Sequence, residues 1–436
     1  MPKNLTAINI VNVLNKQVNK IYNTSLPAVD KASFSNFADQ LRMAPDIVRN
    51  GWCEGLINLV GMQLVKNRRA YTSYFRKLRG EETTGTDIQL IMTNLLSVRS
   101  YTPDADADDF FADEKADTRA QYVQTNYKGK IPLSVNEDTL YQAFLTEEKF
   151  MSYVDSLVLT MYNTLEMADV NAVKELVRRN LAEGNIRIET AEKPTNQAEA
   201  LALTNRIKAA AGDMAVEMAP GYNLSGCDTF TPAEDGIIFT DTETRAVLET
   251  YALPWAFHED YLSLEKDGQG IVTKAGAFGA VHTLYADRLA FEIHPVIGFP
   301  KMTEFYNGST LTLKRWLHYW AVYAMSFFNN CIAWAPAAAI GITSATLKTM
   351  DGSLAANRGG TVINQVASIV VPENKVGDKF GTWTVAGAVS PDTIIDEVSG
   401  KLIISKDETA KTLTVTWTSH IDDSVTAQQT ITINGN

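Results

Sequence analysis

The sequence predicts an α+β protein with a separate all-β domain at its C-terminal end. Three observations carry this prediction. An uninterrupted amphipathic pattern runs from Thr146 to Gly184, helical and strand patterns follow one another from there to Ala335, and short β-branched runs fill the chain beyond residue 345. Apolar residues at a period near 3.6 indicate helices, and apolar residues at a period of two indicate strands.

The N-terminal segment, residues 1–66, is expected to form an arm that is too broken to build its own core. Asn4–Ile21 is typical of a weakly amphipathic helix, and helical fragments follow over Phe34–Val65 with breaks at Pro45 and Gly51. Proline and glycine both interrupt helices. Such an arm needs another surface to pack against.

Residues 67–132 are expected to form an extended, charged loop. Its first part is basic and aromatic, with Tyr71, Tyr74 and Phe75 between the cationic residues Arg68, Arg69, Arg76, Lys77 and Arg79. Proteins that bind single-stranded nucleic acids combine phosphate contacts with aromatic stacking. Arginines that meet acidic groups on a neighbouring subunit are the favoured interpretation, because no nucleic-acid-binding module surrounds this pattern.

The second part of the same loop is acidic. Its carboxylates are Asp104, Asp106, Asp108, Asp109, Asp113 and Glu114. An EF-hand starting at Asp104 would need Gly at its sixth position and Glu at its twelfth, where the chain has Asp109 and Lys115. A solvated tip is therefore favoured over a calcium site. The five basic residues and Asp104, Asp106, Asp108 and Asp109 are the candidates for contacts between subunits.

The stretch from Thr146 to Gly184 predicts the longest helix. Thr146 can cap its start, Glu147 suits the positive end of the helix dipole, Arg179 suits the negative end, and Gly184 offers a stop. The apolar face is formed by Phe150, Val154, Leu157, Val158, Met161, Leu165, Val173, Leu176, Val177 and Leu181. An unbroken helix of this length spans roughly 50–60 Å, which indicates a spine across a flattened molecule.

Helices and strands are both expected after the spine. Ala198–Met218 predicts a helix, and Asp235–Thr240 predicts a buried strand that leads into a helix over Thr242–Ala256. Further short strands through His294 complete a mixed α+β domain. Thr310–Ala335 is expected to be helical and rich in aromatic residues, and to pack back on the spine.

A hinge is expected over Ala335–Ile342, and the chain beyond it predicts a small β-sandwich. Its five clearest strand patterns are VASIVV, GTWTVAG, KLIISK, KTLTVTWTS and AQQTITI. Five or more short strands separated by turn residues in about ninety residues are typical of an immunoglobulin-like sandwich. We expect this domain to have its own core.

Composition limits the class of protein. The 436 residues are 45% hydrophobic and 21% charged, which excludes wholesale disorder, and the net charge of −12 argues against a general nucleic-acid binder. The three cysteines, Cys53, Cys227 and Cys331, are far apart and form no CxxC pair, which argues against a disulfide scaffold or a zinc site. They fit folding in a reducing cytoplasm.

No export or membrane segment is expected. The N-terminal residues lack the continuous apolar region of a signal peptide. Leu317–Gly341 is close to membrane-spanning length, but Asn329, Asn330 and Pro336 interrupt it, which favours a buried core helix over a transmembrane one.

No catalytic motif is present. The sequence has no Gly-rich phosphate loop, no HExxH, no GxSxG and no Rossmann fingerprint. His258, Glu259 and Asp260 form the densest titratable cluster around a histidine, but adjacent residues on a helix do not face each other, so a solvated helix end is favoured over a catalytic base. A pair of carboxylates for glycoside hydrolysis stays open. We expect no enzyme, no catalytic residue, no cofactor and no bound metal.

The order of these parts resembles the major capsid proteins of tailed bacteriophages, most closely those of small short-tailed phages whose subunit ends in a group 2 bacterial immunoglobulin-like domain. The resemblance lies in Lys130–Glu166, which is similar to the passage from the extended loop into the spine helix. It also lies in Asp235–Leu262, similar to the axial domain, in Arg315–Trp334, similar to the return segment, and in the order of the late strand patterns.

The resemblance implies a tailed-phage capsid fold and its domain boundaries. These are an N-terminal arm (1–66), an extended loop (67–132), a peripheral domain with the spine (133–195 and 305–337), an axial domain (196–304) and an immunoglobulin-like domain (345–436). It implies pentamers and hexamers of this chain that form an icosahedral shell around a DNA genome, with DNA on the inner face. A scaffolding protein, a portal, assembly in the host bacterial cytoplasm and an outward-facing immunoglobulin-like domain are also implied.

Two alternatives remain open. The chain could be a virion-surface or cell-wall binding protein that uses its immunoglobulin-like domain, or a hydrolase with such a domain appended. The first rests on the acidic charge and the exposed sheet edges expected of the sandwich.

Overall fold

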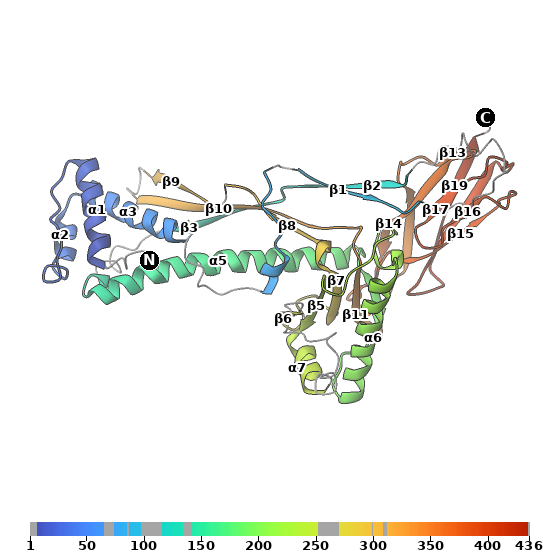
Figure 1. The fold of residues 1–436 in the computed structure, drawn as a ribbon, viewed down its shortest axis with the longest axis horizontal. Helices are drawn as coiled ribbons and strands as arrows, with labels where there is room; N and C mark the ends of the chain where they lie inside the picture. Colours follow the sequence, from blue (N-terminus) through green and yellow to red (C-terminus); the bar gives the residue numbers. More distant parts are fainter. Residues whose placement is uncertain are drawn as a thin grey trace, which may run out of the picture.

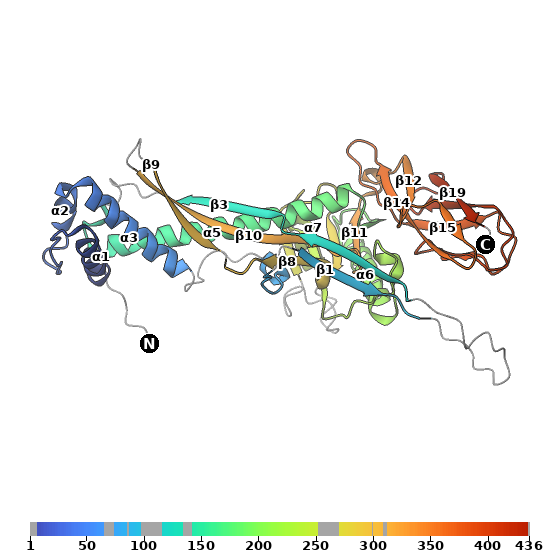
Figure 2. The same ribbon diagram turned by 90° about the horizontal axis from the view of Figure 1, so that it is seen from above.

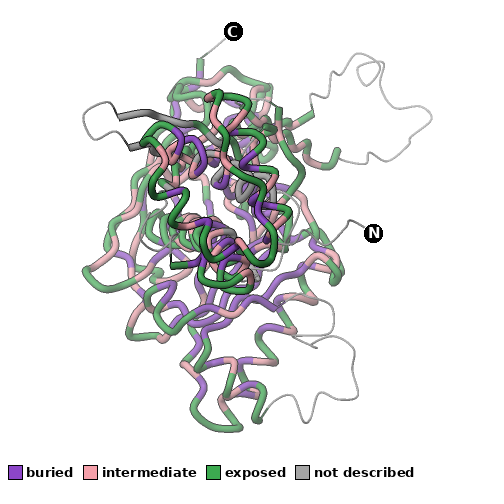
Figure 3. The backbone as a smooth tube through the Cα atoms, turned by 90° about the vertical axis from the view of Figure 1, so that its left-hand side faces the viewer, coloured by how far each residue is buried: buried purple, intermediate pink, exposed green. Residues whose placement is uncertain are grey.

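The computed structural model describes residues 7–64, 74–84, 87–96, 116–133, 142–251, 270–298, 300–307 and 312–434. The molecule is elongated. The N-terminal helices lie at one end, a β-sandwich lies at the other end, and helix α5 (Glu147–Ala182) runs between them (Figure 1). Seen along the long axis, buried segments gather towards the middle and exposed ones surround them (Figure 3).

Helix α5 confirms the predicted spine. The Thr146 hydroxyl accepts a hydrogen bond from the Lys149 N–H (3.2 Å), and Gly184 follows the helix with a φ of +72°, which favours glycine. With 36 residues the helix is about 54 Å long. Its N-terminal half buries Phe150 and Val154 in one core and its C-terminal half buries Val177 in another, so the helix links two cores.

The arm consists of α1 (Ala7–Tyr22), α2 (Phe37–Met43) and α3 (Asp46–Leu64). These helices share a core with the start of α5, in which the Trp52 indole N–H donates to Asn15 Oδ1 (2.9 Å). The arm therefore packs on the spine, as expected. The predicted break at Gly51 is wrong, because Gly51 lies inside α3, where a Cβ atom would collide with the ring of Tyr22. Glycine here permits close helix packing.

One sheet runs along the spine. It contains β3 (Tyr127–Leu133), β8 (Phe291–Pro295), β9 (Lys301–Asn307) and β10 (Thr312–Met325), with β10 paired to each of the others. The prediction that Thr310–Ala335 is helical is wrong. In β10 the buried residues Leu317, Tyr319 and Ala321 alternate with half-buried residues, which is the period of a strand. Because apolar and aromatic residues occur on both faces of β10, the period of two is not apparent in the sequence.

A second sheet has the order β4-β11-β7-β5-β6. Its strands are β4 (Arg187–Thr190), β5 (Gly236–Asp241), β6 (Gly270–Thr273), β7 (Thr283–Asp287) and β11 (Cys331–Ala335). One face packs against α5, and the other packs against α6 (Gln197–Val216). Strand β5, α6 and the following α7 (Thr242–Tyr251) confirm predicted elements, whereas β11 is a strand within the segment predicted to be helical.

The segment predicted as an extended loop contains a hairpin of β1 (Asp87–Thr93) and β2 (Thr118–Gln124). The short helix η1 (Tyr74–Leu78) precedes the hairpin, and β3 follows it. The hairpin continues the line of β3 towards the sandwich (Figure 2). Other short helices are η3 (Pro220–Tyr222), η5 (Arg288–Ala290) and η6 (Ala337–Ala339).

The C-terminal residues form a sandwich of two four-stranded sheets, as predicted. One sheet has the order β12-β14-β17-β16 and the other β13-β19-β18-β15. The strands are β12 (Ser344–Thr349), β13 (Ala355–Asn357), β14 (Thr361–Val370), β15 (Gly381–Ala386), β16 (Ile394–Ile395), β17 (Lys401–Ile403), β18 (Thr412–Ser419) and β19 (Thr426–Asn434). Trp383, Trp417 and Leu413 belong to the core of this sandwich.

Candidate assembly surfaces

Buried polar contacts fix the end of the β1–β2 hairpin beside Thr93 and Thr118, which leads into residues 97–115 and which we call the hairpin root. The Arg119 side chain is only 2% exposed, and its guanidinium donates to Asp117 Oδ2 (3.1 Å) and to the backbone oxygen of Ser225. The Asn94 amide also donates to Asp117 (2.8 Å), and the Asp228 N–H donates to Asn94 Oδ1 (3.1 Å). Because a buried charge without a partner is costly, these contacts hold the hairpin in one place.

Asp117 is held in its charged form. Burial is the largest influence and raises its pKa, but the hydrogen bonds and charge of Arg119, together with Asn94 and Lys401, outweigh burial and leave the pKa below its usual value. Lys401 lies in the sandwich, with its Nζ atom 3.9 Å from Asp117 Oδ2. The hairpin root is therefore linked to the sandwich as well.

The two faces of the hairpin differ. On the inner face, Val123 and Ile88 pack on Val322 and Ala324 of β10. On the outer face, Ile91 is 59% exposed and Tyr122 is 68% exposed. Exposed apolar groups on the outer face of a packed ribbon are typical of a surface that another protein covers.

A second exposed surface lies on the sheet that runs along the spine. It is the side of β3, β10 and β9 that faces away from α5, and we call it the lysine–tryptophan face. Its members are Lys128, Lys130, Lys301, Trp316, His318 and Trp320.

Each of two lysines on this face lies over a tryptophan ring. The Lys128 Nζ atom is 4.8 Å from the centre of the Trp320 ring, and the Lys130 Nζ atom is 4.8 Å from the centre of the Trp316 ring. These cation–π contacts hold the ammonium groups in position. Lys130 and Lys301 also lie on either side of His318 in the strand register.

The residues predicted to contact other subunits differ in their surroundings, and the structure describes only some of them. Arg79 is engaged within the subunit, because its guanidinium lies 3.3 Å from Glu166 and also pairs with Asp169 on α5. Arg76 is half-buried and Lys77 is exposed, both on η1. The candidates that lie outside the described residues are Arg68, Arg69, Asp104, Asp106, Asp108 and Asp109.

The sandwich docks on the second sheet through Asp378. This carboxylate is fully buried and accepts hydrogen bonds from the backbone N–H groups of Ile188 in β4 (2.6 Å) and Phe380 (3.0 Å). The His420 Nε2 atom lies 2.8 Å from the same carboxylate. The Lys379 N–H donates to the backbone oxygen of Gly184 (2.9 Å), just beyond α5. The docking contact is thus tied both to the sheet and to the end of the spine.

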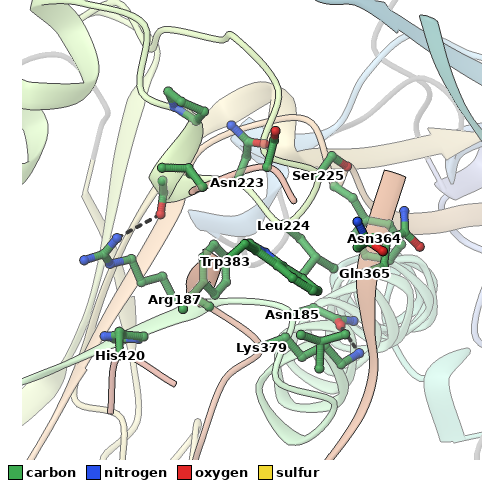
Figure 4. A pocket seen from close by; sticks show the side chains of 18 of the residues that line it. Asn185, Arg187, Asn223, Leu224, Ser225, Asn364, Gln365, Lys379, Trp383 and His420 are labelled. Atoms are coloured by element: carbon green, nitrogen blue, oxygen red, sulfur yellow. Dashed lines mark hydrogen bonds between the residues drawn. The ribbon is translucent and has the colours of Figure 1, made fainter. Parts of the chain in front are cut away.

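A cavity of about 400 Å³ lies at this junction (Figure 4). Two of the cationic groups in its lining have partners within the subunit. Arg187 donates to the Gly221 oxygen (3.0 Å) and lies over the ring of Tyr222, and Lys379 Nζ donates to Asn185 Oδ1 (2.9 Å). Burial lowers the pKa of Lys379. The cavity lies in a joint between domains, and its lining contains no nucleophile paired with a base.

The described residues hold no cluster of three His, Cys, Asp or Glu side chains that could bind a metal ion. Burial raises the pKa of the Cys227 thiol to about 11 and also raises that of Cys331, which keeps both protonated and unreactive at neutral pH. The cluster of His258, Glu259 and Asp260 lies outside the described residues. In the part of the chain that the structure describes, no helix has both the length and the hydropathy needed to cross a membrane.

The hairpin root and the lysine–tryptophan face were not predicted from the sequence. Arg119 and Asp117 lie two residues apart in a segment without a motif, and their partner Ser225 is more than a hundred residues away. The face has a signal in the alternating residues of YKGKIP and WLHYW. This signal was lost because the apolar residues of β10 favoured a helix.

Comparison with known proteins shows that this chain is similar to phage capsid proteins. A family model described as Phi29-like phage major capsid protein matches residues 11–335. The major capsid protein of Bacillus phage B103 is 21% identical over 330 residues, covering 74% of this chain and 72% of that protein. That of Bacillus phage PZA is 21% identical over 365 residues, covering 83% and 79%. The capsid structure of Staphylococcus phage Andhra aligns over 62% of this chain and 86% of that chain, with 14% identity and a TM-score of 0.49.

The assignment rests on the family match, which spans well over half of the chain and covers the arm, the hairpin, the spine and both sheets of the body. This match favours neither an enzyme nor a host-binding protein. The chain belongs to the family of Phi29-like phage major capsid proteins and is a structural subunit of a phage capsid.

Proposed function

We propose that this chain assembles into pentamers and hexamers, which close into an icosahedral shell around a DNA genome. The family match over residues 11–335 is the observation that carries the proposal. A scaffolding protein and a portal are its proposed partners, packaged DNA lies against the inner face, and assembly takes place in the cytoplasm of the host bacterium.

The proposed contacts between subunits come from the hairpin and the arm. The fixed root of the hairpin and the exposed side chains of Ile91 and Tyr122 support this role, because a rigid ribbon loses little conformational entropy when a neighbour covers it. Arg76, Lys77 and the acidic residues Asp104–Asp109 remain the proposed charged contacts. Many repeated contacts of modest strength can together hold a closed shell.

The proposed domains follow the sheets. The two sheets of the sandwich and their separate core support an immunoglobulin-like domain over 345–436, which lies at one end of the molecule (Figure 1). This domain is proposed to face outward. The arm (1–66), extended loop (67–132), peripheral domain (133–195 and 305–337) and axial domain (196–304) complete the division. Because β4 and β11 belong to the same sheet as β7, β5 and β6, the sheet favours assigning both residues 187–190 and residues 331–335 to the axial domain instead.

Sedimentation velocity tests the proposal most cheaply. The chain is expressed in bacteria with and without the scaffolding protein of the same phage, and lysates are compared. We expect rings or shells that sediment far faster than a monomer. A variant in which residues 103–114 are replaced by a short Gly-Ser linker should assemble poorly. A wild-type chain that stays monomeric in both lysates would overturn the proposal.

A further inference from the structure

The cavity between the sandwich and the rest of the subunit has a positively charged lining (Figure 4). Among the described residues that line it, four carry a lysine or arginine side chain and one, Glu183, carries a carboxylate. The four cationic residues are Arg119, Arg187, Lys348 and Lys379. A volume of about 400 Å³ lies within the range of cavities that hold small molecules. Size and charge together favour a small anionic ligand.

The two arginines of this lining are already neutralised by carboxylates that do not line the cavity. Arg119 pairs with a carboxylate in the hairpin root, and the Arg187 Nη2 atom lies 3.3 Å from Glu189 Oε1. The charge of Glu183 is also engaged, because the Arg179 Nε–H donates to its Oε1 atom at 2.7 Å. The uncompensated positive charge of the lining therefore belongs to the two lysines.

Neither lysine has a carboxylate at hydrogen-bond distance within the described part of the chain. The Lys379 Nζ atom donates to Asn185 Oδ1 (2.9 Å), which belongs to a neutral amide. Lys348 is exposed, lies opposite Gln365 in the pairing of β12 with β14, and makes no hydrogen bond or ion pair with a described residue. Burial lowers the pKa of Lys379, and the charge of Lys348 lowers it further, against the opposite effect of Glu183. A bound anion would relieve the repulsion between the two ammonium groups.

The rest of the lining favours an organic phosphate over other anions. Leu224, Phe327 and Phe380 are half-buried and supply apolar surface for an organic group. Planar carboxylates are recognised best by the fork of a free arginine, whereas lysine is a point charge that commonly binds phosphate. The Arg187 Nε–H is buried and has no acceptor within the described part of the chain. A ligand rich in oxygen atoms can supply such an acceptor.

We propose that this cavity binds a small organic phosphate, with Lys348 and Lys379 at the phosphate group and the apolar side chains around the organic part. The two lysines belong to the sandwich, whereas Arg187, Leu224 and Phe327 belong to the body of the subunit. The ligand therefore contacts both parts and stabilises their docked arrangement, because it binds the closed junction and not the open one. This site goes beyond the capsid function and does not depend on it.

Isothermal titration calorimetry on the purified full-length chain tests the binding. The probes are AMP, inorganic phosphate and adenosine, each added at the same ionic strength, which is set with sodium chloride. We expect AMP to bind most tightly, because it offers both the charged group and the organic part. Inorganic phosphate should bind more weakly, and adenosine, which lacks the phosphate, should not bind.

Lysine replacements test which side chains hold the phosphate. In K348M/K379M both charges are removed while the apolar stems are kept, and AMP should bind about 100-fold more weakly, or roughly tenfold for each lysine. K348M alone should lose about tenfold, and it keeps the fold because Lys348 is exposed and unpaired. The matched control is K406M/K411M, on exposed lysines of the sandwich that do not line the cavity, and it should bind AMP as the wild type does.

Hydrogen exchange tests whether the ligand bridges the junction. At a free AMP concentration about 100-fold above its Kd, amides of β4 and of residues 378–380 that exchange by opening of the junction should exchange about 100-fold more slowly. The same addition should leave exchange in K348M/K379M nearly unchanged. Binding of AMP without slower exchange in these segments would overturn the bridging role.

Three results would overturn the site itself. They are no binding of AMP up to about 10 mM, where the free energy gained is too small for a specific site, equal affinity for adenosine and AMP, and wild-type affinity in K348M/K379M. Inorganic phosphate that binds as tightly as AMP would overturn the organic part of the ligand. Assembly of the chain into shells is measured separately by sedimentation, so none of these results bears on the capsid function.

Discussion

Replacing Asp378 by alanine should loosen the sandwich from the rest of the subunit. The buried carboxylate is the hydrogen-bond acceptor for the Ile188 N–H at 2.6 Å and has His420 at 2.8 Å. In the D378A variant the Ile188 N–H stays buried without a partner, which costs about 1–3 kcal/mol, and the loss of the bond from His420 adds a similar amount. We therefore expect the free energy of opening this junction to fall by about 3 kcal/mol.

Hydrogen exchange measured by mass spectrometry reports this change in opening free energy for individual segments of the chain. A loss of about 3 kcal/mol corresponds to roughly 100-fold faster exchange of the protected amides in β4 and in residues 378–380. The matched control is D422A, because Asp422 is an exposed carboxylate that accepts a bond from the Ser424 N–H on a nearby turn. Wild-type exchange rates in β4 of D378A, or equal acceleration in D422A, would refute the role given to Asp378.

Three further predictions concern the hairpin root, the arm and the sandwich. Arg119→Met leaves the buried carboxylate of Asp117 without its main partner, so the hairpin should open and exchange faster while the sandwich keeps its melting temperature in calorimetry. Gly51→Ala should lower the stability of the arm by about 1–3 kcal/mol in urea denaturation, because the new methyl group meets the ring of Tyr22; an unchanged midpoint would contradict that packing. Burial opposes ionisation of Glu408, but hydrogen bonds from Thr393 and three backbone N–H groups outweigh it and lower its pKa to about 2. Because the pKa of Glu408 is lower in the folded state than in the unfolded state, its carboxylate stabilises the sandwich in full above about pH 4.5 and loses this effect as the pH falls towards 2. The variant Glu408→Gln should therefore show a flatter dependence of stability on pH across that range.

The sequence predicted elements whose signals are local. Helix α5 carries its own cap at Thr146, its periodic apolar face and its stop at Gly184, so neighbours are not needed to recognise it. Strand β10 was mistaken for a helix, because one face packs on α5 while the hairpin buries Val322 and Ala324 on the other. Where both faces of a strand carry apolar residues, the alternation in its sequence is too weak to distinguish it from a helix.

The candidate surfaces depended on contacts that sequence patterns do not encode. Asp378 meets Ile188 across 190 residues of chain, and no local feature marks either as a partner. The lysines of β3 form a common surface with the tryptophans of β10 only because the fold places the two strands side by side.

Contacts between copies of one chain hold the proposed shell together, and electron cryomicroscopy of the assembled wild-type particles tests them most directly. The predicted reconstruction shows closed rings of five and six subunits in which each hairpin crosses onto the neighbouring copy. Rings in which every hairpin stays on its own subunit, or a preparation that contains monomers under all assembly conditions, would contradict it.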